Sequence, residues 1–151
     1  MNSNGPEIKI IETKDYEIFS ILARKFDLET SGIGDYFKAW VTISDGKKVG
    51  GISLKKKDKT YLLDIIAVDK NYQKKGLGKK LLLILLKYLK KEKIPKVYVN
   101  TKVPEFFKKF NFKKIPRSKS PKFSDCWTCP QYNKTCFPTP MALELKDFKS
   151  I

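Results

Sequence analysis

Histidine is absent from the chain, and this absence excludes several kinds of chemistry at once. Catalytic triads with an imidazole base and metal centres with imidazole ligands are both ruled out. Long apolar runs are missing as well: the longest, Leu81–Leu86, has six residues, against the roughly 20 of a membrane-spanning helix. Residues 1–7 have no apolar core, so they do not look like a secretory signal. We therefore expect a cytoplasmic protein with no membrane segment.

Acidic residues are scarce in one part of the chain. Residues 70–122 contain 18 Lys and Arg against two acids, whereas the rest has 14 of each sign, so this segment carries the whole net charge of +16. Such a segment attracts anions, whether an acidic substrate, phosphate groups or nucleic acid. For most of these side chains, a solvated lysine-rich surface is an equally good interpretation.

Cysteines are few and close together, at Cys126, Cys129 and Cys136. The Cys-x2-Cys spacing occurs in zinc sites, but a structural zinc ion needs four ligands and the chain offers three cysteines and no histidine. Free thiols, a disulfide, and a metal site completed by Asp125 or a partner chain all stay open as interpretations. Our prediction is that no metal is bound.

The apolar periodicity predicts a single domain, 1–151, that mixes strands and helices. Alternating or β-branched segments indicate strands at 8–11, 39–44, 48–54, 61–68, 97–100, 112–115 and 141–145. Helical spacing indicates helices at 16–26, at 76–91 and at 104–110. Turns are expected at 45–47 and 55–59, a loop at 29–35, and an irregular segment rich in cysteine and proline at 116–140. The order β-α-β-β-β-α-β-α-β-loop-β predicts an α/β fold, with a central mixed sheet flanked by helices.

Two glycines, Gly76 and Gly78, stand where the second helix is expected to begin, directly after a buried strand. The first turn of a helix has unpaired backbone N–H groups, which together with the helix dipole attract anions. Glycine lets a diphosphate approach the backbone closely. A Gly-x-Gly pair alone is weak evidence, because a helix N-terminus without a ligand can have the same pattern. Nearby lysines could neutralise phosphate charge: Lys74, Lys75, Lys79 and Lys80.

In its context this loop resembles a family motif. The segment from Asp64 to Leu82 is similar to the central motif of GNAT N-acetyltransferases, a strand ending in Ala-Val and then Arg/Gln-x-x-Gly-x-Gly/Ala opening a helix. The segment from Asn100 to Ile115, with Phe106-Phe107-Lys108-Lys109-Phe110-Asn111-Phe112, resembles the motif that follows it in the family. The resemblance covers residues 8–115 and implies the GNAT fold, with acetyl-CoA as co-substrate.

The resemblance also implies roles for single residues. Ile66, Ala67 and Val68 would offer backbone groups to the pantetheine arm, and a backbone N–H near Val68 would stabilise the oxyanion of the tetrahedral intermediate. Asn100 would lie beside the cofactor, where two parallel strands separate. Backbone amides of the loop would hold the pyrophosphate, namely those of Gln73, Lys74, Lys75, Gly76, Leu77, Gly78 and Lys79.

Two positions depart from the family pattern. Phe107 replaces the tyrosine that often serves as general acid for the leaving thiolate, and Asn111 replaces the usual glycine. Asparagine tolerates the left-handed conformation better than most residues. The proton would come from water, from another side chain such as Tyr98, or from no donor, because a thiolate is already a fair leaving group.

Asp64 interrupts the apolar strand expected at 61–68. A carboxylate in such a place is costly unless it is paired or functional. It could act as the general base that deprotonates an amine acceptor through water. It could also be a structural carboxylate paired with a lysine or with backbone amides. Both interpretations stay open, and Asp64 is the candidate catalytic residue.

The C-terminal segment supports a narrower resemblance. Ser120 to Pro130, then Cys136 and the segment 141–145, is similar to the end of N-acetylglutamate synthase-like GNAT domains. It implies a small amino acid such as glutamate as acceptor, and a basic cleft suits an anion. The alternatives are a protein, peptide or polyamine acceptor, or a non-catalytic module that binds CoA or nucleic acid. We expect an acetyl-CoA-dependent N-acetyltransferase acting on a small amine; nucleic acid is the less favoured partner, and a homodimer stays open.

Overall fold

The computed structural model describes residues 8–14, 36–72, 76–120 and 139–148, and these residues build one seven-stranded sheet. The strand order in the sheet is β1-β2-β3-β4-β5-β7-β6. The described strands are β1 (Ile8–Glu12), β2 (Tyr36–Ser44), β3 (Lys47–Lys57), β4 (Thr60–Val68), β5 (Lys96–Thr101), β6 (Lys113–Lys114) and β7 (Thr139–Glu144). The described helices are α2 (Leu77–Lys91) and α3 (Pro104–Lys108), with short 3-10 turns η1 (Lys70–Tyr72), η2 (Arg117–Lys119) and η4 (Leu145–Asp147).

The sheet is mixed, which confirms the predicted fold class. β4 and β5 run parallel, and every other pair of neighbouring strands in the described part is antiparallel. The β2–β3 hairpin turns through Asp45 and Gly46, whose φ angles are 50° and 76°. Positive φ at both central residues is what a type I′ hairpin turn requires, so the predicted turn is confirmed.

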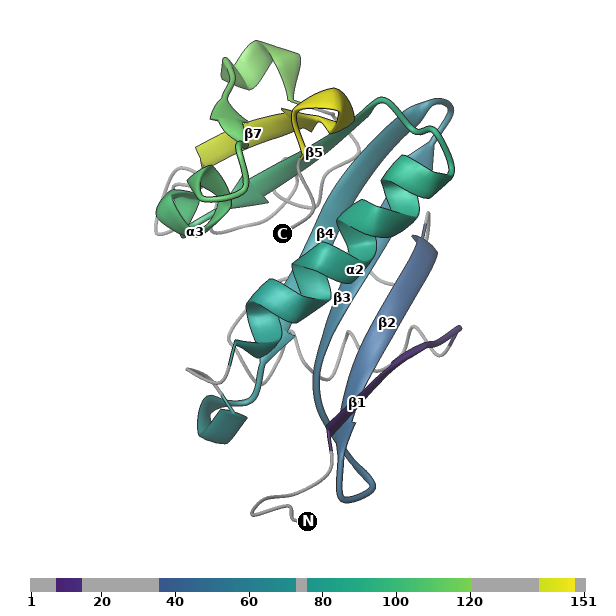
Figure 1. Ribbon diagram of the computed structural model, residues 1–151. Coiled ribbons are helices and arrows are strands. Elements are labelled where there is room, and N and C mark those ends of the chain that lie inside the picture. The colour runs from purple at the N-terminus through teal and green to yellow at the C-terminus, as the bar shows by residue number, and fades with distance from the viewer. Residues whose placement is uncertain (1–7, 15–35, 73–75, 121–138, 149–151) are drawn as a thin grey trace.

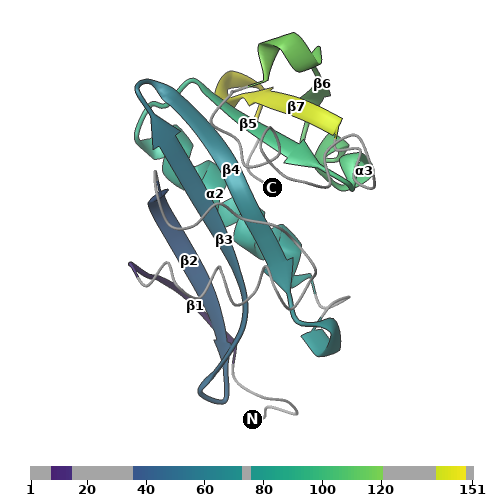
Figure 2. The ribbon, with the colours of Figure 1, turned by 180° about the vertical axis from the view of Figure 1, so that it is seen from behind.

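The helix α2 lies across one face of the sheet, in front of β3 and β4 in Figure 1 and behind them in Figure 2. Its apolar stripe is buried, and it packs on Ile52, Leu54 and Leu63 of these two strands. The stripe consists of Leu77, Leu81, Leu82, Leu85, Leu86 and Leu89. This interface is the main core of the domain and fixes the start of α2 relative to the end of β4.

The end of α2 is set by a backbone motif that the sequence did not indicate. Lys93 has a φ of 59°, and the N–H groups of Lys93 and Ile94 donate to the carbonyls of Lys90 and Leu89 at 3.1 and 2.9 Å. This is the Schellman arrangement, with lysine in the place where glycine is usual. Within the described residues, no helix is both long and apolar enough to cross a membrane.

Some predicted boundaries are wrong. Residues 55–57 were expected in a charged turn, but they continue β3 opposite residues 60–62, and the turn lies at Asp58, where φ is 56°. The predicted helix at 104–110 ends at Lys108, and the strand predicted at 112–115 is reduced to Lys113–Lys114. The last strand begins at Thr139 and ends at Glu144. The helix predicted at 16–26, the loop at 29–35 and the three cysteines lie outside the described residues.

Candidate functional site

The strands β4 and β5 separate partway along their length. They pair only at Leu62 with Tyr98 and at Leu63 with Val99, although β4 continues to Val68. Figure 1 shows the two strands diverging beyond this point. The residues at the end of β4, 66–68, pair with residues 50–52 of β3 on one side. Their other backbone edge lies on the side where the described residues of β4 and β5 no longer pair, a separation called the opening below. An extended ligand could pair with this edge as an added strand.

A β-bulge in β4 stands where this opening begins. Ile65 lies opposite Ser53 and Leu63 opposite Leu54, so Asp64 is an extra residue with no partner position on β3. An extra residue bends the strand and increases its twist. The bulge follows directly after the last β4–β5 pair, and it therefore accounts for the direction in which β4 leaves β5.

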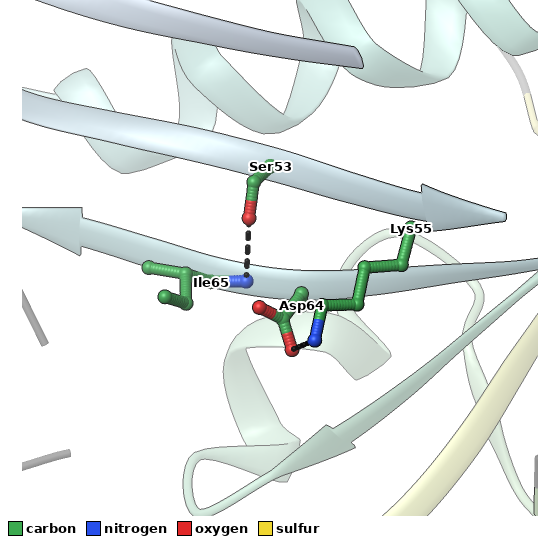
Figure 3. A network of polar contacts seen from close by, with 4 residues as sticks. All are labelled: Ser53, Lys55, Asp64 and Ile65. Atoms are coloured by element: carbon green, nitrogen blue, oxygen red, sulfur yellow. Dashed lines mark hydrogen bonds and ion pairs between the residues drawn. The ribbon is translucent and has the colours of Figure 1, made fainter. Parts of the chain in front are cut away.

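The side chain of Asp64 takes part in a buried ion pair. Its Oδ1 lies 3.9 Å from Nζ of Lys55, and the two side chains are 7% and 2% exposed. Figure 3 shows this pair beside a second contact, in which the N–H of Ile65 donates to Oγ of Ser53 at 3.2 Å. A carboxylate paired with lysine was one of the two interpretations of Asp64 from the sequence. The structure contains this pairing, with Lys55 as the lysine.

The start of α2 has the features expected of an anion site. Gly76 is the N-cap, with a φ of 75°, and no side chain of the described residues caps the helix. The first intrahelical bond in this part runs from the N–H of Lys80 to the carbonyl of Gly76, at 3.0 Å. Helix geometry leaves the amides before Lys80 without partners inside the helix. Leu77 is buried and Lys79 is exposed, while residues 73–75 lie outside the described part.

The two glycines differ in what surrounds them. A Cβ on Gly76 would meet no atom of the described residues within 4 Å, whereas a Cβ on Gly78 would lie 3.7 Å from the ring of Phe106. Gly76 is therefore required by its backbone conformation, and Gly78 is not required by steric contacts within the described residues.

Asn100 lies one residue beyond the last β4–β5 pair, on the β5 side of the opening. Its Oδ1 accepts a hydrogen bond from Oγ of Ser120 at 3.2 Å. Ser120 is 5% exposed, so this contact holds the Asn100 amide in one orientation. The side chain is thus fixed where the resemblance places the cofactor.

Phe107 fills a buried aromatic site in place of the tyrosine of the family pattern. Its side chain is 1% exposed and lies edge-on to Phe106 and Phe112, with ring centroids 5.1 and 5.2 Å apart. Asn111 has a φ of 71°, which confirms the left-handed conformation expected at the usual glycine position. Tyr98, the alternative proton donor, is half-buried and has Lys96 Nζ 5.1 Å from its ring centroid.

Several residues of this region were missed in the sequence. Lys55 looked like part of a charged turn, and Ser53 had no recognisable signal. Gly50 has a signal that could have identified it, because glycine inside a strand often marks a place where two backbones approach closely. A Cβ there would lie 2.8 Å from the carbonyl oxygen of Ala67. The described residues contain no group of three His, Cys, Asp or Glu side chains suited to a metal ion.

The comparisons with known proteins agree with this geometry. Residues 8–112 match the profile of the acetyltransferase (GNAT) family. A GNAT-family acetyltransferase from Staphylococcus aureus Mu50 is 22% identical, with a TM-score of 0.66, and the match covers 92% of this chain and 99% of that one. N-acetylglutamate synthase from Neisseria gonorrhoeae, solved with coenzyme A and N-acetylglutamate, is 17% identical with a TM-score of 0.71, over 92% of this chain and 35% of that one.

A third structure shows how far acceptors vary on this fold. The ribosomal-protein-S18-alanine N-acetyltransferase from Escherichia coli is 16% identical, with a TM-score of 0.65, over 92% of this chain and 94% of that one. At these identities the structural likeness shows the fold alone, so it does not fix the acceptor. The family profile covers well over half of the sequence. The chain belongs to the acetyltransferase (GNAT) family and is an N-acetyltransferase with acetyl-CoA as its co-substrate.

Proposed function

We propose that the protein transfers the acetyl group of acetyl-CoA to the amine of a small acidic acceptor, an amino acid of the glutamate kind. The charge of the segment 70–122 supports this most directly. Residues 70–122, which include α2, β5, α3 and β6, hold 18 basic residues and two acids. Such a field attracts an anionic acceptor and repels a polyamine. The resemblance of the C-terminal segment to N-acetylglutamate synthase-like domains points to the same class of acceptor.

We propose that acetyl-CoA lies along the end of β4. The backbone of Ile66, Ala67 and Val68 would pair with the pantetheine arm, and a backbone N–H near Val68 would stabilise the oxyanion. Amides from Gln73 to Lys79 would hold the pyrophosphate, with Asn100 beside the cofactor on β5. Two observations support this placement: Gly76 is left-handed, and no contact within the described residues requires glycine at 78, where glycine would let the pyrophosphate approach the backbone.

For the proton of the acceptor amine we propose Asp64 as the base, acting through water. The position at the opening supports it, because the bulge places Asp64 next to the point where β4 and β5 separate. Lys55, with Nζ 3.9 Å from Oδ1 of Asp64, would hold the carboxylate in place at the opening. Asp64→Asn would remove the charge and keep the shape. With acetyl-CoA at saturation, we expect kcat to fall by about 10²-fold or more; an unchanged kcat would show that Asp64 has a structural role only.

The leaving thiolate has no tyrosine at the usual position. Phe107 can exclude water and pack against the site, but its ring has no proton to give. We propose that the thiolate departs without a protein general acid at this position.

The proposal can be tested by following free-thiol release from acetyl-CoA with a panel of amino acids, polyamines and peptides. Gly76→Asp places a negative charge at the start of α2 and should abolish turnover by repelling the pyrophosphate. Gly46→Asp is a matched control. Gly46 is also exposed, has a φ of 76° against 75° for Gly76, and has equally open surroundings, but it lies in the β2–β3 turn.

Turnover with an acidic amino acid, lost in Gly76→Asp and kept in Gly46→Asp, would support the proposal. A preference for polyamines or basic peptides would contradict the acidic acceptor. Coenzyme A binding without turnover of any amine in the panel would show that the small-amine assignment is wrong.

A further inference from the structure

Two side chains of β3 hold the bulge of β4 from one side. Ser53 and Lys55 are two residues apart, so they project on the same side of the strand. Oγ of Ser53 accepts the N–H of Ile65 at 3.2 Å, and Nζ of Lys55 lies 3.9 Å from Oδ1 of Asp64. Figure 3 shows both contacts directed at consecutive residues of the bulge. One contact thus holds the backbone of the bulged segment and the other holds the side chain of the extra residue.

These contacts are made in the interior of the protein. Ser53 is 0% exposed and Lys55 is 2% exposed, and Lys55 is among the largest fully buried side chains of the described residues. Burying a lysine and an aspartate costs free energy. An apolar pair of similar size often stabilises a protein as much or more. We therefore attribute these polar contacts to the position that they give β4. A requirement for a filled core does not explain them.

The register of β4 depends on the bulge. With Asp64 as the extra residue, Ile66 lies opposite Ile52, and Ala67 lies opposite Gly51. If the extra residue were lost or moved beyond Val68, every residue of the end of β4 would shift by one position. In a strand, a shift of one residue turns each side chain to the other face and exchanges the backbone groups that point to each edge. The edge that faces the β4–β5 opening would then present different amides and carbonyls.

We propose that Ser53 and Lys55 are positioning residues that fix the bulge at Asp64 and thereby set the backbone edge of residues 66–68 to which acetyl-CoA binds. This inference rests on the proposed placement of the pantetheine arm along β4. It predicts that the two side chains control coenzyme A affinity without touching the ligand. It makes no use of the identity of the acceptor.

The test measures coenzyme A binding by isothermal titration calorimetry and stability by urea unfolding, on the full chain. Ser53→Ala removes the acceptor of the Ile65 N–H, and we expect the dissociation constant for coenzyme A to rise by about tenfold or more. Ser44→Ala is the matched control, because Ser44 is also 0% exposed and its Oγ has no hydrogen-bond partner among the residues that the structure describes. It should change the dissociation constant by less than about twofold.

A double variant separates positioning from stability. Lys55→Met would leave Asp64 buried without its cation, so this single variant is expected to be unstable. Lys55→Met with Asp64→Leu removes both charges and should recover most of the stability. We expect it to stay about tenfold or more weaker than the wild type for coenzyme A.

Wild-type affinity in either Ser53→Ala or the double variant would overturn the inference, because the contacts would then serve the fold alone. If the wild type binds coenzyme A but acetylates some other class of amine, the proposed acceptor is wrong and this inference stands. If the wild type does not bind coenzyme A, the proposed placement and this inference are both overturned.

Discussion

Lys55 and Asp64 form an ion pair inside the protein, with Nζ of one 3.9 Å from Oδ1 of the other and side chains that are 2% and 7% exposed. Removing one partner leaves an uncompensated buried charge, which in proteins typically costs about 3–5 kcal/mol of stability. We expect Lys55→Met to lower the free energy of unfolding by this amount in urea titrations. A smaller loss, comparable to that of a surface pair, would mean that Asp64 is satisfied by its other contacts.

A surface pair provides the control for this measurement. Nζ of Lys38 lies 3.0 Å from Oε2 of Glu12, with side chains 24% and 47% exposed. Exposed pairs contribute about 0–1 kcal/mol, because solvent screens the charges. Lys38→Met should therefore cost much less than Lys55→Met, although its ion pair is the shorter of the two.

Gly50 and Gly78 should respond in opposite ways to alanine. A Cβ at position 50 would lie 2.8 Å from the carbonyl oxygen of Ala67, a backbone atom that can move only if the β3–β4 ladder shifts. Gly50→Ala should therefore lower both the unfolding free energy and the affinity for coenzyme A. At position 78 the nearest atom, in the Phe106 ring, would be 3.7 Å away, an ordinary contact.

Gly78→Ala should raise the unfolding free energy, since alanine inside a helix is favoured over glycine by about 0.5–1 kcal/mol. If the backbone at 78 approaches the pyrophosphate, the same variant should bind coenzyme A more weakly. Urea unfolding and calorimetric titration of the same samples would show the two effects separately. A variant that is more stable and binds coenzyme A as the wild type does would contradict the role given to Gly78.

The difference between Gly76 and Gly50 shows what could be predicted from the sequence. The loop at 73–79 is a local motif of a few consecutive residues before an amphipathic helix, so its pattern predicts both the helix start and a ligand. The order of the described strands and helices along the chain followed from the alternation of strand and helix signals, whereas the order of the strands within the sheet was not predicted. The contacts of Gly50 and Lys55 depend on the register of β3 against β4, which is a tertiary property set by a bulge. The sequence of one strand does not indicate which residue of the neighbouring strand forms the bulge.

Phe107 provides a test of the leaving-group step. Phe107→Tyr keeps the ring, which packs between Phe106 and Phe112, and adds the hydroxyl of the family pattern. If the thiolate leaves without a general acid here, kcat should change by less than about threefold. A gain of about 10²-fold or more, the range of general-acid catalysis, would show that protonation of the thiolate limits the reaction. Phe107→Leu serves as the control for loss of the aromatic ring.

The surface cluster of Lys38, Glu12 and Tyr88 should make the protein less stable at alkaline pH. The hydrogen bond from Lys38 to Glu12 raises the pKa of Lys38 above its usual 10.5, and burial raises the pKa of Tyr88 above its usual 10.0. Nζ of Lys38 lies 4.7 Å from the centroid of the Tyr88 ring, so the two groups titrate close together in space. In both cases the folded protein keeps its proton to a higher pH than the unfolded chain does.

The stabilisation by these two groups is therefore fully present below the unfolded pKa values of 10.0 and 10.5 and is lost as the pH rises through the folded ones. Between these limits the unfolded chain has released protons that the folded protein still holds, so the free energy of unfolding falls with pH. Glu12→Gln and Tyr88→Phe should each make that fall less steep in urea titrations at a series of alkaline pH values. Glu144→Gln, which removes an exposed carboxylate 4.0 Å from Lys146, is the control and should leave the slope as in the wild type. A slope that is equal in all three variants would show that the Lys38 cluster contributes nothing to the alkaline transition.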